Sequence, residues 1–136
     1  MAKYSVGYTA GVYDLFHVGH LNILREAKGL CDTLIVGVST DELAIKKGKE
    51  IIIPFKERIE IISSIRYVDI TIPQTTFNKY EIWEKIKFDV LIVGDDWFGN
   101  EKWHEYGVQL GEVHVPIIYF PYTSKISSTN LRKKIK

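Results

Sequence analysis

Residues 4–20 read YSVGYTAGVYDLFHVGH, and this stretch decides the fold. Residues 4–12 are rich in β-forming side chains, and this run closes around a glycine, Gly11. Apolar residues then repeat at helical spacing, at Leu21, Leu24, Ala27 and Leu30. A strand, a glycine-bearing turn and a helix therefore follow one another, which is the opening unit of an α/β fold.

The same alternation continues along the chain. Apolar runs predict further strands at residues 33–39, 68–72, 90–94 and 115–120, and helices are predicted to begin near residues 40, 54, 80, 103 and 128. Ser39 or Thr40 is the expected cap of the second helix, and Pro54 suits the first turn of the third. The apolar face of that third helix is expected at Ile59, Ile61, Ile62 and Ile65.

No linker, repeat or low-complexity tract interrupts this pattern, so residues 1–136 are expected to form a single domain. Strands that alternate with helices predict a Rossmann-like, doubly wound, five-stranded parallel sheet with helices on both faces. Ligands of such sheets bind at the carboxyl ends of the strands. Three segments should therefore meet at one edge: residues 11–20, residues 94–97 and residues 122–129.

Composition narrows the class of function. The chain is 46% hydrophobic and 26% charged with a formal net charge of +1, which fits a soluble globular protein and gives no support to nucleic-acid binding. Its single cysteine, Cys31, allows neither an internal disulfide nor a cysteine-based zinc site. No apolar run approaches the roughly 20 residues that span a bilayer, so a cytoplasmic location without a membrane partner is expected.

Residues 11–20 have the chemistry of an anion site. A helix that starts after a strand aims backbone N–H groups and its positive dipole end at the edge of the sheet. Gly11 and Gly19 permit close approach of a ligand, while His17 and His20 lie three residues apart on one side of the turn. Imidazoles donate hydrogen bonds to phosphate oxygens whether neutral or charged.

Other interpretations of these residues are weaker or stay open. A His-x-x-His pair can bind a metal, but the sequence places no carboxylate or cysteine cluster nearby to complete the site, so no protein metal site is predicted. One histidine could instead cap the helix, or both could be incidental. The motif matches neither a P-loop nor a dinucleotide-binding glycine fingerprint.

A family resemblance follows from motifs spread over nearly the whole chain. HVGH at residues 17–20 resembles the H-x-G-H signature of the nucleotidyltransferase superfamily. It occurs here with STDE (39–42), Arg58, IRYVD (65–69), GDDW (94–97) and ISST (126–129). This order and spacing are similar to those of the cytidylyltransferase family, and most of all to its members that act on glycerol 3-phosphate, choline phosphate and ethanolamine phosphate.

The resemblance implies an enzyme that transfers CMP from CTP, with Mg²⁺, to a small phosphorylated alcohol, most of all glycerol 3-phosphate, and releases pyrophosphate. The catalytic residues would be His17, His20, Lys49 and Asp96. The acceptor would be bound by Lys47, Arg66 and Lys79. Nucleotide contacts would come from Gly11, Val12, Tyr13, His17, His20, Lys49, Asp96, Tyr122, Thr123, Lys125, Ile126, Ser127, Ser128 and Thr129.

Several of these residues have a structural alternative. Lys46 to Lys49 could be a solvated loop, and Asp95 with Asp96 could solvate or cap a loop. Arg66, considered without the resemblance, would be a cation at a helix end. The resemblance places it near the active site and the interface of a homodimer.

The last segment departs from the family pattern. Tyr122 stands where the family has an arginine, and Lys125 stands where glycine is usual. Tyrosine has no guanidinium fork, so Lys125 is expected to restore the charge as a point cation. The change leaves two alternatives open: transfer from ATP, and transfer to another acceptor such as choline, ethanolamine, ribitol or sugar phosphate. A non-catalytic nucleotide-binding module is a third, less consistent with the two histidines, Lys49 and Asp96.

Overall fold

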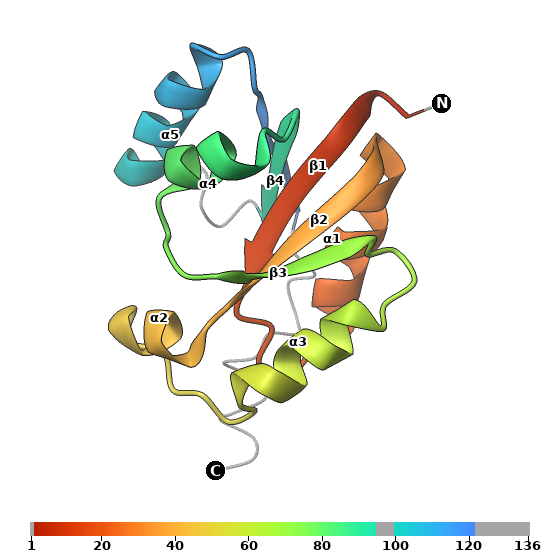
Figure 1. Ribbon diagram of the computed structural model, residues 1–136, viewed down its shortest axis with the longest axis vertical. Coiled ribbons are helices and arrows are strands. Elements are labelled where there is room, and N and C mark those ends of the chain that lie inside the picture. Colours follow the sequence, from red (N-terminus) through yellow and green to blue (C-terminus); the bar gives the residue numbers. More distant parts are fainter. Residues whose placement is uncertain (1, 95–99, 122–136) are drawn as a thin grey trace.

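The computed structural model describes residues 2–94 and 100–121. Its centre is a five-stranded sheet of β1 (Tyr4–Gly11), β2 (Cys31–Ser39), β3 (Ile70–Gln74), β4 (Val90–Gly94) and β5 (Ile117–Phe120). The strand order is β3-β2-β1-β4-β5, and every neighbouring pair is parallel (Figure 1). The predicted Rossmann-like fold is therefore confirmed.

Helices cover both faces of the sheet. The helices are α1 (Val18–Leu30), α2 (Asp41–Lys46), α3 (Phe55–Ser63), α4 (Lys79–Ile86) and α5 (Glu101–Gly111). One core joins α1 and α3 to the sheet through Leu24, Ala27 and Ile62, whereas the other joins α4 and α5 through Ile82 and Leu110 (Figure 1). Since β1 pairs with both β2 and β4, the winding reverses beside β1, which is where such sheets bind ligands.

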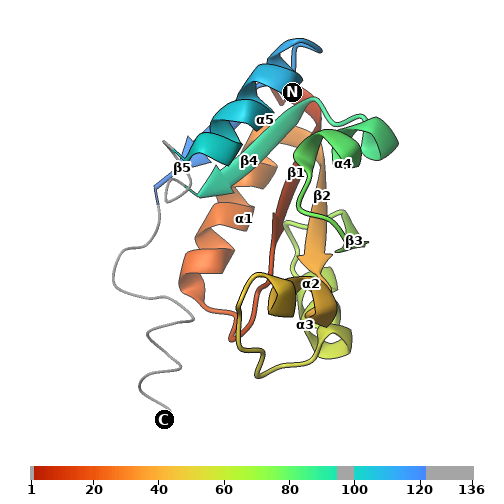
Figure 2. The ribbon, with the colours of Figure 1, turned by 90° about the vertical axis from the view of Figure 1, so that its left-hand side faces the viewer.

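The carboxyl ends of the strands carry the connections that the sequence singled out. β1 runs into the loop before α1, and β2 runs into α2, which lies beyond the carboxyl end of β2 (Figure 2). Thr40 caps α2, as predicted, because its Oγ1 accepts the Leu43 N–H at 3.2 Å. Gly48 ends this segment with a φ of 80°, a conformation that glycine adopts without strain.

Several predicted boundaries and faces differ from the structure, including the starts of β2 and β5 at Cys31 and Ile117. Pro54 is the N-cap of α3 rather than its first residue. β3 starts at Ile70 instead of Val68, because the Val68 N–H donates to the Ile65 carbonyl and closes a turn there. On α3, Ile61 points outward and is 37% exposed, whereas Arg58 is fully buried on the inner face.

The predicted helix from Ser128 lies outside the described residues. Among the helices of residues 2–94 and 100–121, none has the length and apolar character needed to cross a bilayer.

Candidate active site

The side chains of His17 and His20 both accept backbone hydrogen bonds at the amino end of α1. His17 is the N-cap residue, and its Nδ1 accepts the Gly19 N–H at 3.0 Å. His20, at the third helical position, accepts the His17 N–H at its own Nδ1, at 3.3 Å. Together these bonds form a capping box, an arrangement usually made by Ser or Thr with Glu or Gln.

The capping box fixes which nitrogen of each imidazole carries the proton. A nitrogen that accepts an N–H cannot itself be protonated, so both rings hold their proton on Nε2. Burial lowers the pKa of His17 and favours this neutral form further. The rings stack with centroids 4.0 Å apart, so the amino end of α1 presents two neutral Nε2–H donors beside the positive end of its dipole.

Aromatic rings and unusual backbone angles shape the loop before α1. Tyr13 has a φ of 58° and Leu15 a φ of 52°, both in the left-handed region that non-glycine residues enter at a cost of about 1–3 kcal/mol. The Tyr13 ring meets the edge of His20 at 5.4 Å, and Phe16 stacks on His20 at the same distance. Strain of this kind at a ligand-binding edge is typical of functional loops.

Gly11 makes room for a side chain of its own loop, while its predicted contact with a nucleotide stays a prediction. A Cβ on Gly11 would lie 3.0 Å from the Cζ of Tyr13, so the glycine makes room for this ring and not simply for a ligand. At Val12, the carbonyl accepts a 2.6 Å hydrogen bond from Arg58 Nη1. Its carbonyl is therefore engaged within the protein, while the predicted backbone contacts to a nucleotide stay a prediction.

Two buried charged residues fasten the loops of the site together. The Asp14 carboxylate accepts the N–H groups of Ile52 and Ile53, at 2.9 and 2.8 Å. Arg58 donates to the carbonyls of Val12, Ser39 and Ile53 and pairs with Asp41 at 2.6 Å. The loop before α1, the end of β2 and the segment after α2 are therefore one hydrogen-bonded unit.

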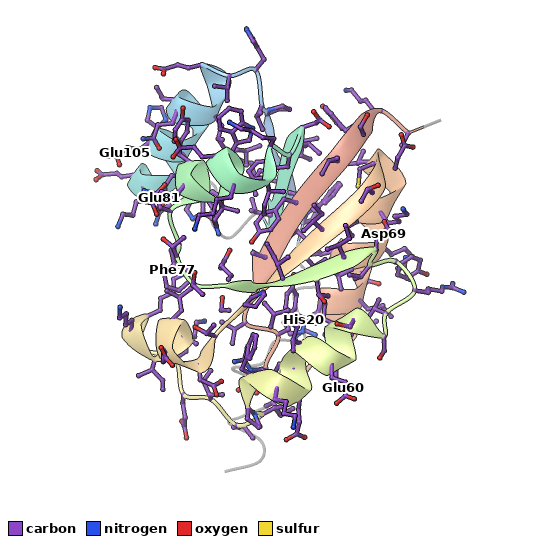
Figure 3. All side chains as sticks on the ribbon, viewed as in Figure 1. His20, Glu60, Asp69, Phe77, Glu81 and Glu105 are labelled. Atoms are coloured by element: carbon purple, nitrogen blue, oxygen red, sulfur yellow. The ribbon has the colours of Figure 1, made fainter. Side chains whose placement is uncertain are left out.

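The predicted lysines follow α2 at this edge of the sheet. Lys47 is the C-cap residue of α2, and its Nζ lies 4.5 Å from the ring centroid of Phe77. Phe77 follows β3 and lies between α2 and α4 (Figure 3). Lys49 is exposed, and its backbone N–H donates to the Ala44 carbonyl, so the chain turns back toward α2 there. Asp14 and Arg58 both bind the segment that follows Lys49.

Lys79 is buried, which is unusual for a lysine. Its Nζ donates to Gln74 Oε1 at 3.2 Å and lies 5.4 Å from the Trp103 ring centroid. Burial, together with the charge of Lys47, lowers the pKa of Lys79 to about 7. The fold thus brings Lys47 and Lys79, two of the three predicted acceptor contacts, near each other.

Arg66 is not brought to this edge. It lies in the connection that precedes β3, is exposed, and donates to the Tyr67 hydroxyl at 2.9 Å. Asp69 and Phe77, before and after β3, mark the two ends of this strand in Figure 3. Within one chain, Arg66 therefore lies at the opposite edge of the sheet from His20. Asp96 and the segment Tyr122 to Thr129 lie outside the described residues.

Sequence reasoning missed the site roles of Asp14, Arg58 and Gln74. A signal existed for Arg58: with Phe55, Ile59 and Ile62 it occupies the helical spacing of the buried face of α3. Asp14 and Gln74 gave no such signal, because their partners are distant in sequence.

The fold and these donors define an α/β protein with a candidate anion site at the switch point of its sheet. Residues 8–134 match the family model described as cytidylyltransferase-like, and the chain belongs to this family. The chain is 34% identical over 134 residues to the glycerol-3-phosphate cytidylyltransferase of Bacillus subtilis, covering 93% of this chain and 94% of the relative. It is 36% identical over 126 residues to the FAD synthase of Thermococcus kodakarensis, covering 86% and 83%.

Solved structures agree with this assignment. A lipopolysaccharide core biosynthesis protein from Thermoplasma volcanium superposes with a TM-score of 0.74 at 26% identity, over 88% of this chain and 97% of that one. A pantoate-beta-alanine ligase from Francisella tularensis shares the fold, with a TM-score of 0.65 at 14% identity, over 97% of this chain and 66% of its own. The protein is therefore a nucleotidyltransferase of the cytidylyltransferase type.

Proposed function

We propose that this enzyme transfers CMP from CTP to glycerol 3-phosphate, giving CDP-glycerol and pyrophosphate. The observation that carries the proposal is the pair of Nε2–H donors at the amino end of α1, on the same edge of the sheet as Lys47 and the buried Lys79. Donors for one phosphate group and cations for another are what a transfer between two phosphates requires. Relatives that are glycerol-3-phosphate cytidylyltransferases match over more than nine-tenths of both chains.

In the proposed reaction, an oxygen of the acceptor phosphate attacks the α-phosphorus of CTP. A new P–O bond forms there, the bond to the oxygen that bridges the α- and β-phosphorus breaks, and pyrophosphate leaves with that oxygen. Negative charge grows on the α-phosphate and on the leaving group. His17 and His20 donate from Nε2 to these oxygens, and the fixed imidazoles need no reorganisation during the step.

Lys47 and Lys79 are proposed to bind the acceptor phosphate, and Lys49 the triphosphate. The positive charges of Lys47 and Lys79 repel each other, and a dianion bound between them would stabilise both. The acceptor phosphate provides this dianion and arrives already deprotonated, so no general base is required.

Magnesium is proposed to enter with the triphosphate. Mg²⁺ is commonly bound by substrate phosphates with one or two carboxylates. β4 ends at Gly94 on this edge of the sheet, and Asp95 and Asp96 follow Gly94 in the sequence. Within residues 2–94 and 100–121 no group of three or more His, Cys, Asp or Glu side chains could hold a metal. Asp96 is the proposed carboxylate, and the metal would neutralise charge on the phosphates.

Adenylyl transfer is the second candidate, because FAD synthases are as similar in sequence as the cytidylyltransferases are. FAD formation from FMN and ATP also joins two phosphates with loss of pyrophosphate. The substituted Tyr122 and Lys125 of the last segment add to this candidate. Other acceptor phosphates, including those of choline, ethanolamine, ribitol and sugars, form a third group.

A pyrophosphate-release assay separates these candidates. CTP, ATP, GTP and UTP are each paired, with Mg²⁺, with glycerol 3-phosphate, the other acceptors named above and FMN. We expect turnover with CTP and glycerol 3-phosphate, and none when either substrate or Mg²⁺ is omitted. Turnover with ATP and FMN alone would replace the proposal by the second candidate.

A homodimer is also proposed, because Arg66 can contribute to catalysis only in an active site other than that of its own chain. Sedimentation of the wild type should give twice the mass of the chain. Arg66→Ala should then lower turnover without changing the fold. A fully active monomer would refute both the dimer and the role of Arg66.

A further inference from the structure

A buried polar network links four elements of the fold at the acceptor side of the site. Its centre is Gln74, the last residue of β3, which is 4% exposed. Gln74 Oε1 accepts from the Tyr8 hydroxyl at 3.0 Å and from Lys79 Nζ at 3.2 Å, and Gln74 Nε2 donates to Ser39 Oγ at 3.2 Å. The carboxamide therefore has one orientation, with its oxygen toward two donors and its nitrogen toward β2.

The surrounding sequence makes room for this network. Tyr8 is fully buried on β1, and its ring stacks on Phe88. A Cβ on Gly37 would lie 2.0 Å from the Tyr8 hydroxyl oxygen, so only glycine at this position of β2 lets the hydroxyl reach Gln74. The Gln74 carbonyl also accepts the Thr40 N–H at 3.2 Å, which joins the end of β3 to the cap of α2.

Lys79 has no carboxylate partner within 4.0 Å among the described residues. The groups that face its amine are Gln74 of β3, Tyr8 of β1 through Gln74, Trp103 of α5 and the like charge of Lys47 beyond α2. A buried ammonium without a counter-ion is unfavourable, whereas the same ammonium beside a phosphate dianion is stabilised. This arrangement suits an amine that is completed by an anionic ligand.

We propose that Gln74 is a positioning residue for the acceptor phosphate: its carboxamide, held by Tyr8 and Ser39, fixes the Lys79 amine where the phosphate binds. The inference rests on the proposed function, in which Lys79 contacts the acceptor. Gln74 acts through Lys79 and does not itself touch the substrate. A neutral amide holds the amine without competing for it, whereas a carboxylate at this position would bind the ammonium and weaken its contact with substrate.

A double-mutant cycle tests this. Gln74→Met removes both hydrogen-bonding ends at similar volume, and we expect the KM for glycerol 3-phosphate to rise roughly tenfold, with the KM for CTP within twofold. In the Lys79→Met background, Gln74→Met should change the acceptor KM by less than about twofold, because the two residues act as one unit. Equal factors in both backgrounds, or an unchanged acceptor KM in the single variant, would overturn the proposal.

Controls separate positioning from loss of structure. Gln109→Met makes the same chemical change at an exposed position of α5 and should leave both KM values unchanged. Gln74→Glu keeps an acceptor for Tyr8 and Lys79, so the fold is retained while the acceptor KM should rise at least as much as in Gln74→Met. An acceptor KM unchanged in Gln74→Glu would contradict the requirement for a neutral amide.

The contact between Gln74 and Lys79 can also be tested without enzyme turnover, so the test remains valid if CTP and glycerol 3-phosphate do not react. In protein labelled with ¹³C-lysine, the Lys79 Cε resonance is assigned by its loss in Lys79→Met and followed against pH. Gln74→Glu should move its titration upward by about one pH unit or more, since a carboxylate stabilises the ammonium. An unmoved titration refutes contact between Gln74 and Lys79, whereas a shift without turnover refutes only the proposed substrates.

Discussion

The capping function of His17 and its proposed catalytic function can be separated by one substitution. His17→Asn keeps a side-chain oxygen near the position of Nδ1, where it can accept the Gly19 N–H that His17 accepts at 3.0 Å. The variant has no donor at the position of Nε2. Asparagine is among the best N-cap residues, so the free energy of unfolding should change by less than about 0.5 kcal/mol. His17→Ala loses the acceptor as well and should cost about 1 kcal/mol.

Turnover should respond differently. Both variants lose the Nε2–H donor, and removing one donor to a developing negative charge typically lowers kcat by about 10²–10³-fold, or about 2.7–4 kcal/mol. We therefore expect equal losses of kcat in His17→Asn and His17→Ala but unequal losses of stability. Pyrophosphate release measures the first and urea unfolding the second.

The matched variant at the other histidine is His20→Gln. Glutamine at the third helical position completes a capping box by accepting the N-cap N–H, as His20 Nδ1 accepts the His17 N–H. It should retain stability and lose turnover in the same way. If His17→Asn keeps kcat within about tenfold of the wild type, or if it is as unstable as His17→Ala, the assignment of Nδ1 to the cap and Nε2 to the reaction is refuted.

The remaining predictions concern the loops and the pH dependence. Arg58→Met should destabilise the fold by about 3–5 kcal/mol in urea unfolding, because it leaves three carbonyls and Asp41 without their donor, whereas Arg25→Met, on the exposed face of α1, should stay within about 0.5 kcal/mol. Asp14→Asn should speed amide exchange at Ile52 and Ile53, which lose a carboxylate acceptor; unchanged exchange would contradict its role. Lys125→Ala should weaken CTP binding in calorimetry, and unchanged affinity would end the idea that it replaces the missing arginine. The pKa of His17 is lowered in the folded protein, so between that pKa and about 6.5 the unfolded chain binds one more proton than the folded chain. The contribution of His17 to stability is therefore complete above this range and is lost as the pH drops through it. If His17→Asn shows the same loss of stability in full, the loss does not come from His17.

The sequence was sufficient for features that depend on local periodicity. Strand and helix order followed from apolar runs and helical spacing, and the cap at Thr40 followed from its place before Asp41 and Glu42. The placement of residues 11–20 between β1 and the start of α1 also followed, whereas the anion site expected there stays a prediction. The capping box of His17 and His20 is equally local, since the two residues are three positions apart.

Features that depend on contacts across the chain were beyond the sequence. The burial and bonding of Arg58 are one example, because its bond to the Val12 carbonyl spans 46 positions. Ile61 is 37% exposed because the buried face of α3 is centred on Phe55, Arg58, Ile59 and Ile62, and Ile61 lies at its margin. The Tyr13 ring that lies against Gly11 is a further contact that the sequence pattern does not indicate.

The difference between local and distant contacts separates the residues proposed to carry out the reaction from those proposed to select the acceptor substrate. The Nε2–H donors of His17 and His20 are fixed within four residues of chain, so any protein that carries this turn before a helix can present them. The proposed acceptor side is held by contacts among Tyr8, Gln74 and Lys79, which come from three different elements. Changes in β1, β3 or α4 can therefore alter the acceptor side while leaving the histidine turn intact. That is consistent with a family in which relatives of similar identity are named glycerol-3-phosphate cytidylyltransferase and FAD synthase. The substrate is accordingly best sought through Gln74 and Lys79, and the reaction through His17 and His20.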